Sequence, residues 1–90
     1  MTTPVHRPDV HGFEATVDGH VGRLDYEMHE GVLTIVHTEV DPALEGRGVA
    51  GALVRAALDH ARANGLKVRA RCAYAASYME RHPESMSPRA

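Results

Sequence analysis

The spacing of the apolar residues changes at Asp41-Pro42, and this change limits the folds that the chain can adopt. Before this point, apolar and polar residues alternate in three runs, which predicts strands of a β-sheet. The runs are residues 13–17, 23–28 and 32–40. Asp18-Gly19 and Glu30-Gly31 separate them, and each pair is typical of a tight hairpin turn. The first half of the chain is therefore predicted to be an antiparallel meander with residues 32–40 as a central strand.

After Asp41-Pro42 the apolar residues follow a helical period. From Ala50 to Ala61 they form one amphipathic stripe, and Asn64-Gly65 is expected to end the helix with Gly65 in the left-handed region. A short strand is predicted over residues 66–72, and a short helix over Ala73–Arg81. This order predicts an α/β fold with a mixed sheet, in which a right-handed helical crossover joins the last strand to the third.

Length and composition narrow the possible classes of protein. The 90 residues are expected to form a single domain over 1–90, with a loose lead-in over residues 1–10 and a frayed tail over 84–90. The net charge of −2, with its signs interspersed, argues against nucleic-acid binding. The lone Cys72 and the scattered histidines suggest no disulfide and no metal site. No apolar run reaches the roughly 18 residues of a membrane span, so we expect a cytoplasmic protein without membrane contact.

The glycine-rich segment Gly46–Gly51 lies immediately before the helical stripe. Unpaired amides at a helix N-terminus, close approach at glycine and the helix dipole together favour a phosphate or pyrophosphate. The segment also matches the dinucleotide pattern G-x-G-x-x-G, but two hairpins precede it and residues 41–45 separate it from its strand. A Walker A loop is excluded because no Lys-Ser/Thr pair follows Gly51. The remaining alternative is a ligand-free helix start selected for packing.

Residues Val40 to Ala50, VDPALEGRGVA, resemble the acetyl-CoA motif of the GCN5-related N-acetyltransferases. That motif is a strand and a short loop followed by Gln/Arg-x-x-Gly-x-Gly/Ala at the start of a helix. Gly48 and Ala50 match its last two fixed positions, whereas Glu45 departs from the Gln/Arg position. The wider stretch 37–83 resembles the minimal N-acetyltransferase-domain-containing-1-like subgroup. The resemblance implies a minimal mixed sheet of this family, with acetyl-CoA as co-substrate.

The resemblance also implies where coenzyme A binds. The pantetheine arm would pair with the backbone of Glu39 and Val40, where that strand diverges from the following one. The backbone N–H near Val40 would stabilise the oxyanion of the tetrahedral intermediate. The phosphates would bind the turn formed by Gly46, Arg47, Gly48, Val49, Ala50 and Gly51.

Five residues are candidates for the chemistry. The family's usual acid is a tyrosine in the last helix, and Met79 falls at that position, so Tyr78 and, second, Tyr74 are the substitutes. His37 and Glu39 lie two apart on one strand face, as a base and its orienting carboxylate or as two solvated side chains. Cys72 falls where the family commonly has an asparagine that contacts pantetheine. Its thiol would accept the acetyl group, or it is a small buried apolar residue.

Transfer of an acetyl group from acetyl-CoA to an amine is the expected function. Ordinary family members insert two helices between the first two strands, where this chain has only Asp18-Gly19. The acceptor site would then be open, which suits an amine on a peptide, a protein or a polyamine, or requires a second subunit in a homodimer. A non-catalytic acyl-CoA-binding regulatory module, or an interaction domain without a ligand, is the alternative.

Overall fold

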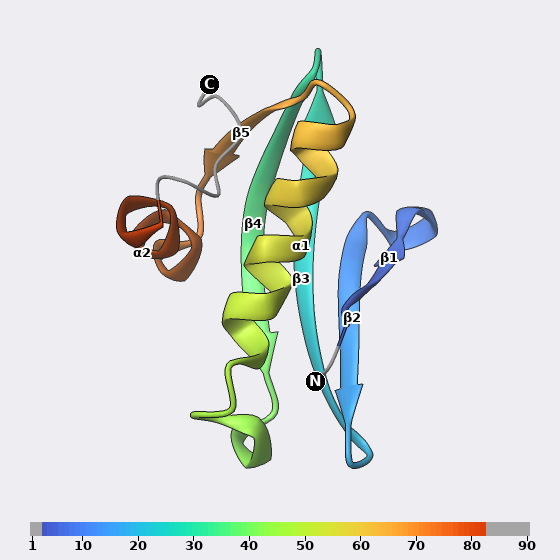
Figure 1. Ribbon diagram of the computed structural model, residues 1–90. Coiled ribbons are helices and arrows are strands. Elements are labelled where there is room, and N and C mark those ends of the chain that lie inside the picture. The colour runs from blue at the N-terminus through green and yellow to red at the C-terminus, as the bar shows by residue number, and fades with distance from the viewer. Residues whose placement is uncertain (1–2, 83–90) are drawn as a thin grey trace.

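The computed structural model describes residues 3–82, which form a five-stranded sheet and two α-helices (Figure 1). The strands are β1 (Val5–Arg7), β2 (Gly12–Val17), β3 (His20–His29), β4 (Val32–Val40) and β5 (Lys67–Ala70), and the helices are α1 (Val49–Ala63) and α2 (Ala73–Arg81). The strand order is β1-β2-β3-β4-β5; all neighbours are antiparallel except β4 and β5, which are parallel. The predicted mixed α/β sheet is confirmed.

Both predicted hairpin turns are present. Asp18 and Gly19 have φ of 51° and 79°, and Val17 pairs with His20 across a two-residue connection. Glu30 and Gly31 have φ of 47° and 80°. Paired left-handed residues give the turn a twist that matches the right-handed twist of the strands. The meander is therefore fixed by local backbone chemistry.

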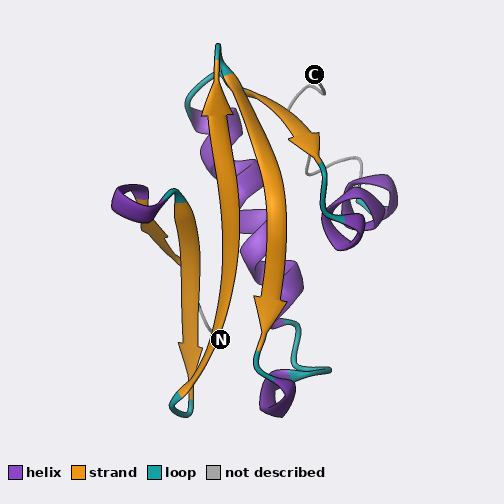
Figure 2. Ribbon diagram, turned by 180° about the vertical axis from the view of Figure 1, so that it is seen from behind, coloured by secondary structure: helices purple, strands orange, loops and turns teal. Residues whose placement is uncertain are grey.

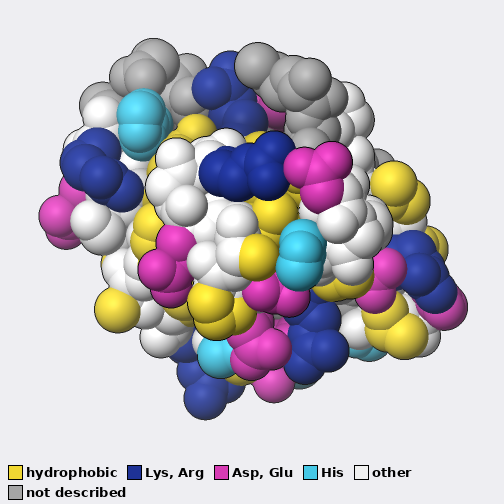
Figure 3. Space-filling model, turned by 90° about the horizontal axis from the view of Figure 1, so that it is seen from below, with side chains coloured by type: hydrophobic (Ala, Val, Ile, Leu, Met, Phe, Trp, Pro, Cys, Tyr) yellow, Lys and Arg dark blue, Asp and Glu magenta, His cyan; other side chains and the backbone are white. Residues whose placement is uncertain are grey.

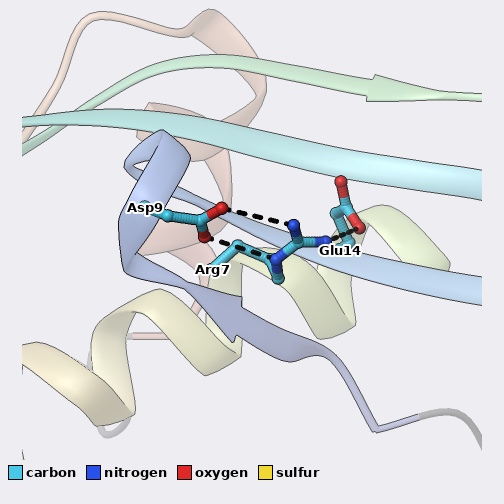
Figure 4. Close-up of polar contacts among 3 residues, drawn as sticks. All are labelled: Arg7, Asp9 and Glu14. Atoms are coloured by element: carbon cyan, nitrogen blue, oxygen red, sulfur yellow. Dashed lines mark hydrogen bonds and ion pairs between the residues drawn. The ribbon is translucent and has the colours of Figure 1, made fainter.

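The N-terminal segment corrects the expectation of a loose lead-in. Val5–Arg7 forms β1, and a 3-10 turn, Pro8–Val10, connects it to β2. Arg7 forms ion pairs with Glu14 at 3.0 Å and with Asp9 at 3.4 Å (Figure 4). This strand is too short for an alternation of apolar and polar residues to be visible in the sequence. Its contacts also come partly from residues distant along the chain, which leave no local pattern.

An aromatic cluster also holds β1 in place. The His6 ring stacks on Phe13 with centroids 4.6 Å apart, and its Nε2 lies 2.6 Å from the Tyr26 hydroxyl. The His60 ring of α1 lies 4.3 Å from the His6 ring. The cluster thus links β1, β2, β3 and α1.

Helix α1 covers one face of the sheet, and its apolar stripe supplies much of the core (Figure 1). Figure 2 shows the other face, which no described helix covers. The predicted stripe is confirmed apart from its first residue. Ala50 is only half-buried, and Val49, the first residue of the helix, is buried instead. The largest side chains with at most 1% exposure are Leu24, Leu33, Ile35, Leu44, Leu53, Leu58, Val54 and Val68. Full burial stabilises each such side chain by roughly 1.5–3 kcal/mol.

The remaining C-terminal elements follow the prediction with one change of boundary. Gly65 has φ of 66° and ends α1, and α2 spans Ala73–Arg81 as predicted. Strand β5 is shorter than the predicted 66–72, because the N–H groups of Arg71 and Cys72 both bond to the Ile35 carbonyl and the chain then enters α2. The predicted stop at Pro83 and the tail over 84–90 lie outside the described residues.

Strand β4 diverges from β5 after Ile35. The register between β3 and β4 skips Val36, so β4 has a β-bulge there. Only Val32–Ile35 pair with β5, whereas residues 37–40 of β4 pair with β3 alone among the described residues. A bulge bends its strand and increases the local twist. The bulge therefore opens a gap between β4 and α2 in the direction of the glycine turn.

Candidate functional site

The turn between β4 and α1 determines how backbone groups are placed at the N-terminus of α1. The Asp41 carboxylate accepts a hydrogen bond from the Ala43 N–H at 2.9 Å, which fixes a 3-10 turn over Pro42–Leu44. Gly46 and Gly48 follow, both with φ of 77°, and Gly48 is the N-cap of α1 without a side-chain cap. Residues with a side chain are strained at this φ, which explains both glycines.

The amides of this turn differ in their partners. The Arg47 N–H donates to the Leu44 carbonyl at 3.1 Å, so it belongs to the turn itself. The first hydrogen bond of α1 runs from Ala52 N–H to the Gly48 carbonyl at 3.0 Å. The N–H groups of Gly48–Gly51 therefore have no acceptor among residues 3–82. Unpaired amides at the positive end of a helix dipole favour an anion there.

A groove of about 320 Å³ connects the end of β4 with these amides. It is lined by Val40, Leu44, Glu45, Gly46, Gly48, Val49, Ala50, Gly51 and Tyr74. The lining includes every residue that the sequence suggested for coenzyme A except Glu39 and Arg47. The Arg47 guanidinium instead pairs with Asp18 of the β2–β3 hairpin at 3.2 Å. Figure 3 shows this end of the molecule, where acidic and basic side chains are interspersed.

The open edge of β4 presents backbone groups to the groove. The Asp41 N–H bonds across to the Val21 carbonyl at 3.1 Å. Because successive residues of a strand direct their backbone groups to opposite sides, the N–H and C=O of Val40 and Thr38 point into the gap. An extended ligand can pair with them there.

The bulge also decides which side chains of β4 face this groove. Thr38 lies opposite the buried Leu24, so its side chain is on the α1 face. His37 lies opposite Asp25 and points to the uncovered face, together with Glu39. His37 Nε2 is 3.3 Å from Glu39 Oε2, and their side chains are 53% and 66% exposed. His37 and Glu39 thus share one strand face, as expected, and their contact is exposed to solvent.

Cys72 lies on the groove side of β4. Its Sγ is 3.6 Å from the Thr38 hydroxyl, and it is the N-cap residue of α2. Partial burial by itself raises the pKa of Cys72, but the amides of Ala75 and Tyr74 and the Thr38 hydroxyl outweigh it and lower the pKa. These hydrogen bonds stabilise the thiolate form of Cys72, whereas His37 lies on the opposite face of the sheet. No Cys–His pair forms between these two residues.

The tyrosines of α2 have different surroundings. Tyr78 is 8% exposed and does not line the 320 Å³ groove. A hydrogen bond with its side chain is the largest cause of the raised pKa of Arg55, and its ring is 4.3 Å from the His82 ring. Tyr74 is 39% exposed and lines the groove, and Met79 is buried in the core. Of the two tyrosine candidates, the structure brings Tyr74 to the groove.

Thr38 is the residue that sequence reasoning missed. It contacts Cys72 and lies on the α1 face of the sheet only because Val36 forms a bulge. Without the bulge, simple alternation from the buried Ile35 would bring His37 and Glu39 to that face instead. No sequence pattern indicated the bulge.

Residues 3–82 lack two further features. They contain no group of three or more histidine, cysteine or acidic side chains placed to hold a metal ion. None of the helices described in this range is long and apolar enough to span a bilayer.

Comparison with known proteins supports the acetyltransferase motif. Residues 12–87 match the family model described as GCN5-related N-acetyl-transferase. The solution NMR structure of a GCN5-like protein from Staphylococcus aureus superposes with a TM-score of 0.70 at 26% identity, covering 94% of this chain and 82% of that one. No curated protein sequence matches the chain. Since the family model matches most of the chain, this protein belongs to the GCN5-related N-acetyltransferase family.

Proposed function

We propose that the protein transfers an acetyl group from acetyl-CoA to an exposed amine, as a cytoplasmic member of the minimal N-acetyltransferase-domain-containing-1-like subgroup. The observation that supports this most is the row of unpaired amides from Gly48 to Gly51 at one end of a groove that reaches the open edge of β4. The pyrophosphate of coenzyme A binds these amides, and the pantetheine arm pairs with Thr38 and Val40. The thioester then lies near Thr38 and Cys72.

The amine must lose a proton before it attacks. A lysine-type ammonium has a pKa of about 10.4, so a base lowers the barrier. His37, held by Glu39, is the base on the uncovered face of the sheet. The Val40 N–H points into the gap and stabilises the oxyanion of the tetrahedral intermediate. Tyr74, rather than Tyr78, is the residue of α2 that can protonate the coenzyme A thiolate, because it lines the groove.

Cys72 offers a covalent route. Its thiolate attacks the acetyl carbonyl, the coenzyme A thiolate leaves and takes a proton, and the acetyl group is held as a thioester on Cys72. The amine then attacks this second thioester from the gap beside Thr38. The lowered pKa of Cys72 and its contact with Thr38 support this step.

The acceptor site is proposed to be broad. The short 3-10 turn Pro8–Val10 joins β1 to β2, and the two-residue turn Asp18-Gly19 joins β2 to β3, so neither connection contains a pair of α-helices to enclose the acceptor. No described helix covers the face that carries His37. A peptide or protein amine therefore has room, whereas a small amine finds few walls to hold it. A homodimer would add walls from the second copy.

Release of free thiol from acetyl-CoA tests the function. We expect release that depends on the amine and is faster with a peptide amine than with a compact amine such as a short diamine. A strong preference for one compact amine would contradict the open site. Stabilisation by coenzyme A without thiol release, for any amine in the panel, would favour the second candidate, a non-catalytic acyl-CoA-binding module. The engagement of Tyr78 with Arg55 and the buried Met79 favour that second candidate.

A further inference from the structure

The basic side chains of this chain are almost all arginines. Of its ten lysine and arginine residues, only Lys67 is a lysine. Both residue types are positively charged at neutral pH, so charge alone does not favour one over the other. They differ in reactivity, because a lysine amine that has lost its proton attacks acyl groups, whereas a guanidinium stays protonated in proteins. The difference matters most for basic side chains close to a bound acyl thioester.

Arg71 lies at the edge of the gap between β4 and α2. Its N–H bonds to the Ile35 carbonyl at 2.9 Å, at the point where β4 diverges from β5. Val68 of β5 is buried, so alternation places the Arg71 side chain on the uncovered face of the sheet, where it contacts Glu27 of β3. The next residue along the chain is Cys72. A lysine in place of Arg71 would therefore hold an amine beside the gap that is proposed to contain the thioester.

The ion pairs on this face do not require a guanidinium. Arg71 Nη1 is 3.5 Å from Glu27 Oε1, and Arg23 Nε is 3.6 Å from Asp25 Oδ2. Charge-assisted hydrogen bonds are about 2.7–2.9 Å long, so neither pair uses the bidentate geometry in which arginine is superior to lysine. The Arg71 and Glu27 side chains are 62% and 64% exposed, and such pairs stabilise a fold only weakly. Ion pairing therefore does not explain why residue 71 is an arginine.

The one lysine of the chain lies away from the gap. Lys67 pairs in register with Val32, at the opposite end of β5 from Arg71. The separation of four residues corresponds to roughly 13 Å along a parallel strand, which is longer than an extended lysine side chain. Arg69 lies between the two on the same face of the strand. Lys67 therefore cannot bring its amine to the gap of its own molecule.

On the basis of the proposed function, we propose that Arg71 keeps a positive charge at the edge of the gap without supplying an amine, and so prevents the protein from acetylating itself. The gap then accepts amines from other molecules only. With a lysine at this position, the neutral amine would attack the acetyl carbonyl and the coenzyme A thiolate would leave. The proton lost by the amine would go to the thiolate, and a stable amide would remain on the protein.

The mass of Arg71→Lys after incubation with acetyl-CoA tests the proposal. Hydroxylamine treatment cleaves thioesters, so it removes any acetyl group from Cys72 and leaves only amides to be counted. We expect Arg71→Lys to gain one acetyl amide, located at residue 71 by tandem mass spectrometry of its peptides. The amide should form about 100-fold faster than at a distant lysine, because an amine held beside the thioester has a high effective concentration.

Arg62→Lys is the matched control. It makes the same chemical change at a side chain that is 49% exposed, in the last turn of α1 and at the opposite end of the helix from Gly48. It therefore measures the uncatalysed acetylation of an exposed lysine by acetyl-CoA. In the wild-type protein, Lys67 should be acetylated no faster than this control.

Two results would overturn the role of Arg71 alone while the wild-type protein still acetylates peptide amines. One is equal rates of amide formation in Arg71→Lys and Arg62→Lys, and the other is acetylation of Lys67 in the wild-type protein well above the control rate. If the folded wild-type protein acetylates no peptide amine, both the role of Arg71 and the proposed function fail.

Discussion

The two long edges of β4 differ in how far they are paired. On the antiparallel side, β4 pairs with β3 from Val32 to Val40, interrupted only at Val36. On the parallel side, it pairs with β5 only from Val32 to Ile35 and then diverges. Along the first edge, the backbone groups of β4 form hydrogen bonds with β3 and complete the meander. The second leaves backbone groups of Thr38 and Val40 directed into a gap, where a ligand can use them.

This difference separates residues that stabilise the fold from residues that bind. Leu33 and Ile35, before the bulge, are fully buried, whereas Thr38 and Val40, after it, are only half-buried and border the groove side. Bulges are common beside active sites because they redirect side chains. Changes on the antiparallel side should therefore alter the free energy of unfolding, and changes along the gap should alter ligand binding.

Leu24→Ala should give the largest effect on stability. Leu24 is fully buried on β3, between Phe13 and Thr38 in the sheet, and removing a buried leucine side chain costs about 2–5 kcal/mol. Urea denaturation measures this loss, and coenzyme A affinity of the folded fraction should stay unchanged. Val21→Ala, on the same strand at a side chain that is 48% exposed, should stay within about 0.5 kcal/mol of wild type. A large change in the coenzyme A affinity of Leu24→Ala would contradict the idea that residues on the antiparallel side stabilise the fold and residues along the gap bind the ligand.

Gly48→Glu should remove the effect of coenzyme A on stability. Coenzyme A at 100 times its dissociation constant is expected to stabilise the wild-type protein by about 2.7 kcal/mol. A glutamate places charge and bulk where the pyrophosphate binds the amides, so thermal unfolding with and without the ligand should coincide. The substitution also strains the backbone, because φ is 77° at Gly48.

Gly31→Glu is the control for that strain. Gly31 has φ of 80° with no atom near its absent Cβ, as Gly48 does, but it lies in the β3–β4 hairpin. The two variants should lose comparable stability without ligand, and only Gly31→Glu should still be stabilised by coenzyme A. A Gly48→Glu variant that responds normally to coenzyme A would place the pyrophosphate elsewhere.

Local chemistry explains which parts of the fold could be predicted. Asp18-Gly19, Gly65 and the stripe over α1 each encode their structure within a few residues, and the structure has all three. Strand β1 and the bulge at Val36 could not be predicted, because His6 depends on Phe13 and Tyr26, and Val36 on the register of β3. Non-local contacts leave no short pattern in the sequence.

The residues of the site also divide into those placed by local sequence and those placed by contacts distant along the chain. The glycine turn is local, so its residues were predicted, and the groove contains them. The orientation of Thr38 depends on the bulge, and the interaction of Tyr78 with Arg55 depends on the packing of α2 against α1. The sequence therefore favoured Tyr78, whereas in the structure Tyr74 lines the groove. The catalytic roles of Cys72, His37, Glu39 and Tyr78 stay predictions.

Cys72→Ala tests whether the gap supports covalent chemistry. We expect the wild-type protein incubated with acetyl-CoA to gain the mass of one acetyl group, and Cys72→Ala to gain none. Because Cys72 is only partly buried, the substitution should cost less than about 1 kcal/mol of stability. Full transfer activity in Cys72→Ala, with no adduct on the wild-type protein, would assign Cys72 to packing.

His6→Phe should give the smallest effect, confined to the antiparallel side and to acidic pH. Burial first, and the nearby His60 second, lower the pKa of His6 below its ordinary value of 6.5. The folded state therefore binds fewer protons than the unfolded state just below pH 6.5. The contribution of His6 to the free energy of unfolding is complete above pH 6.5 and is lost as the pH drops toward the lowered pKa.

His6 is partly exposed, so we expect a loss of about 0.5 kcal/mol or less between pH 7 and pH 5.5, reduced by solvent screening. Urea midpoints at several pH values measure it. His6→Phe keeps the stacking on Phe13 and should flatten this dependence, whereas His29→Phe, at a side chain that is 85% exposed, should leave it as in wild type. Coenzyme A affinity should not follow the His6 substitution, because His6 packs against β2, β3 and α1 and does not line the 320 Å³ groove. A pH dependence of unfolding that is identical in His6→Phe and wild type would show that protonation of His6 does not cause it.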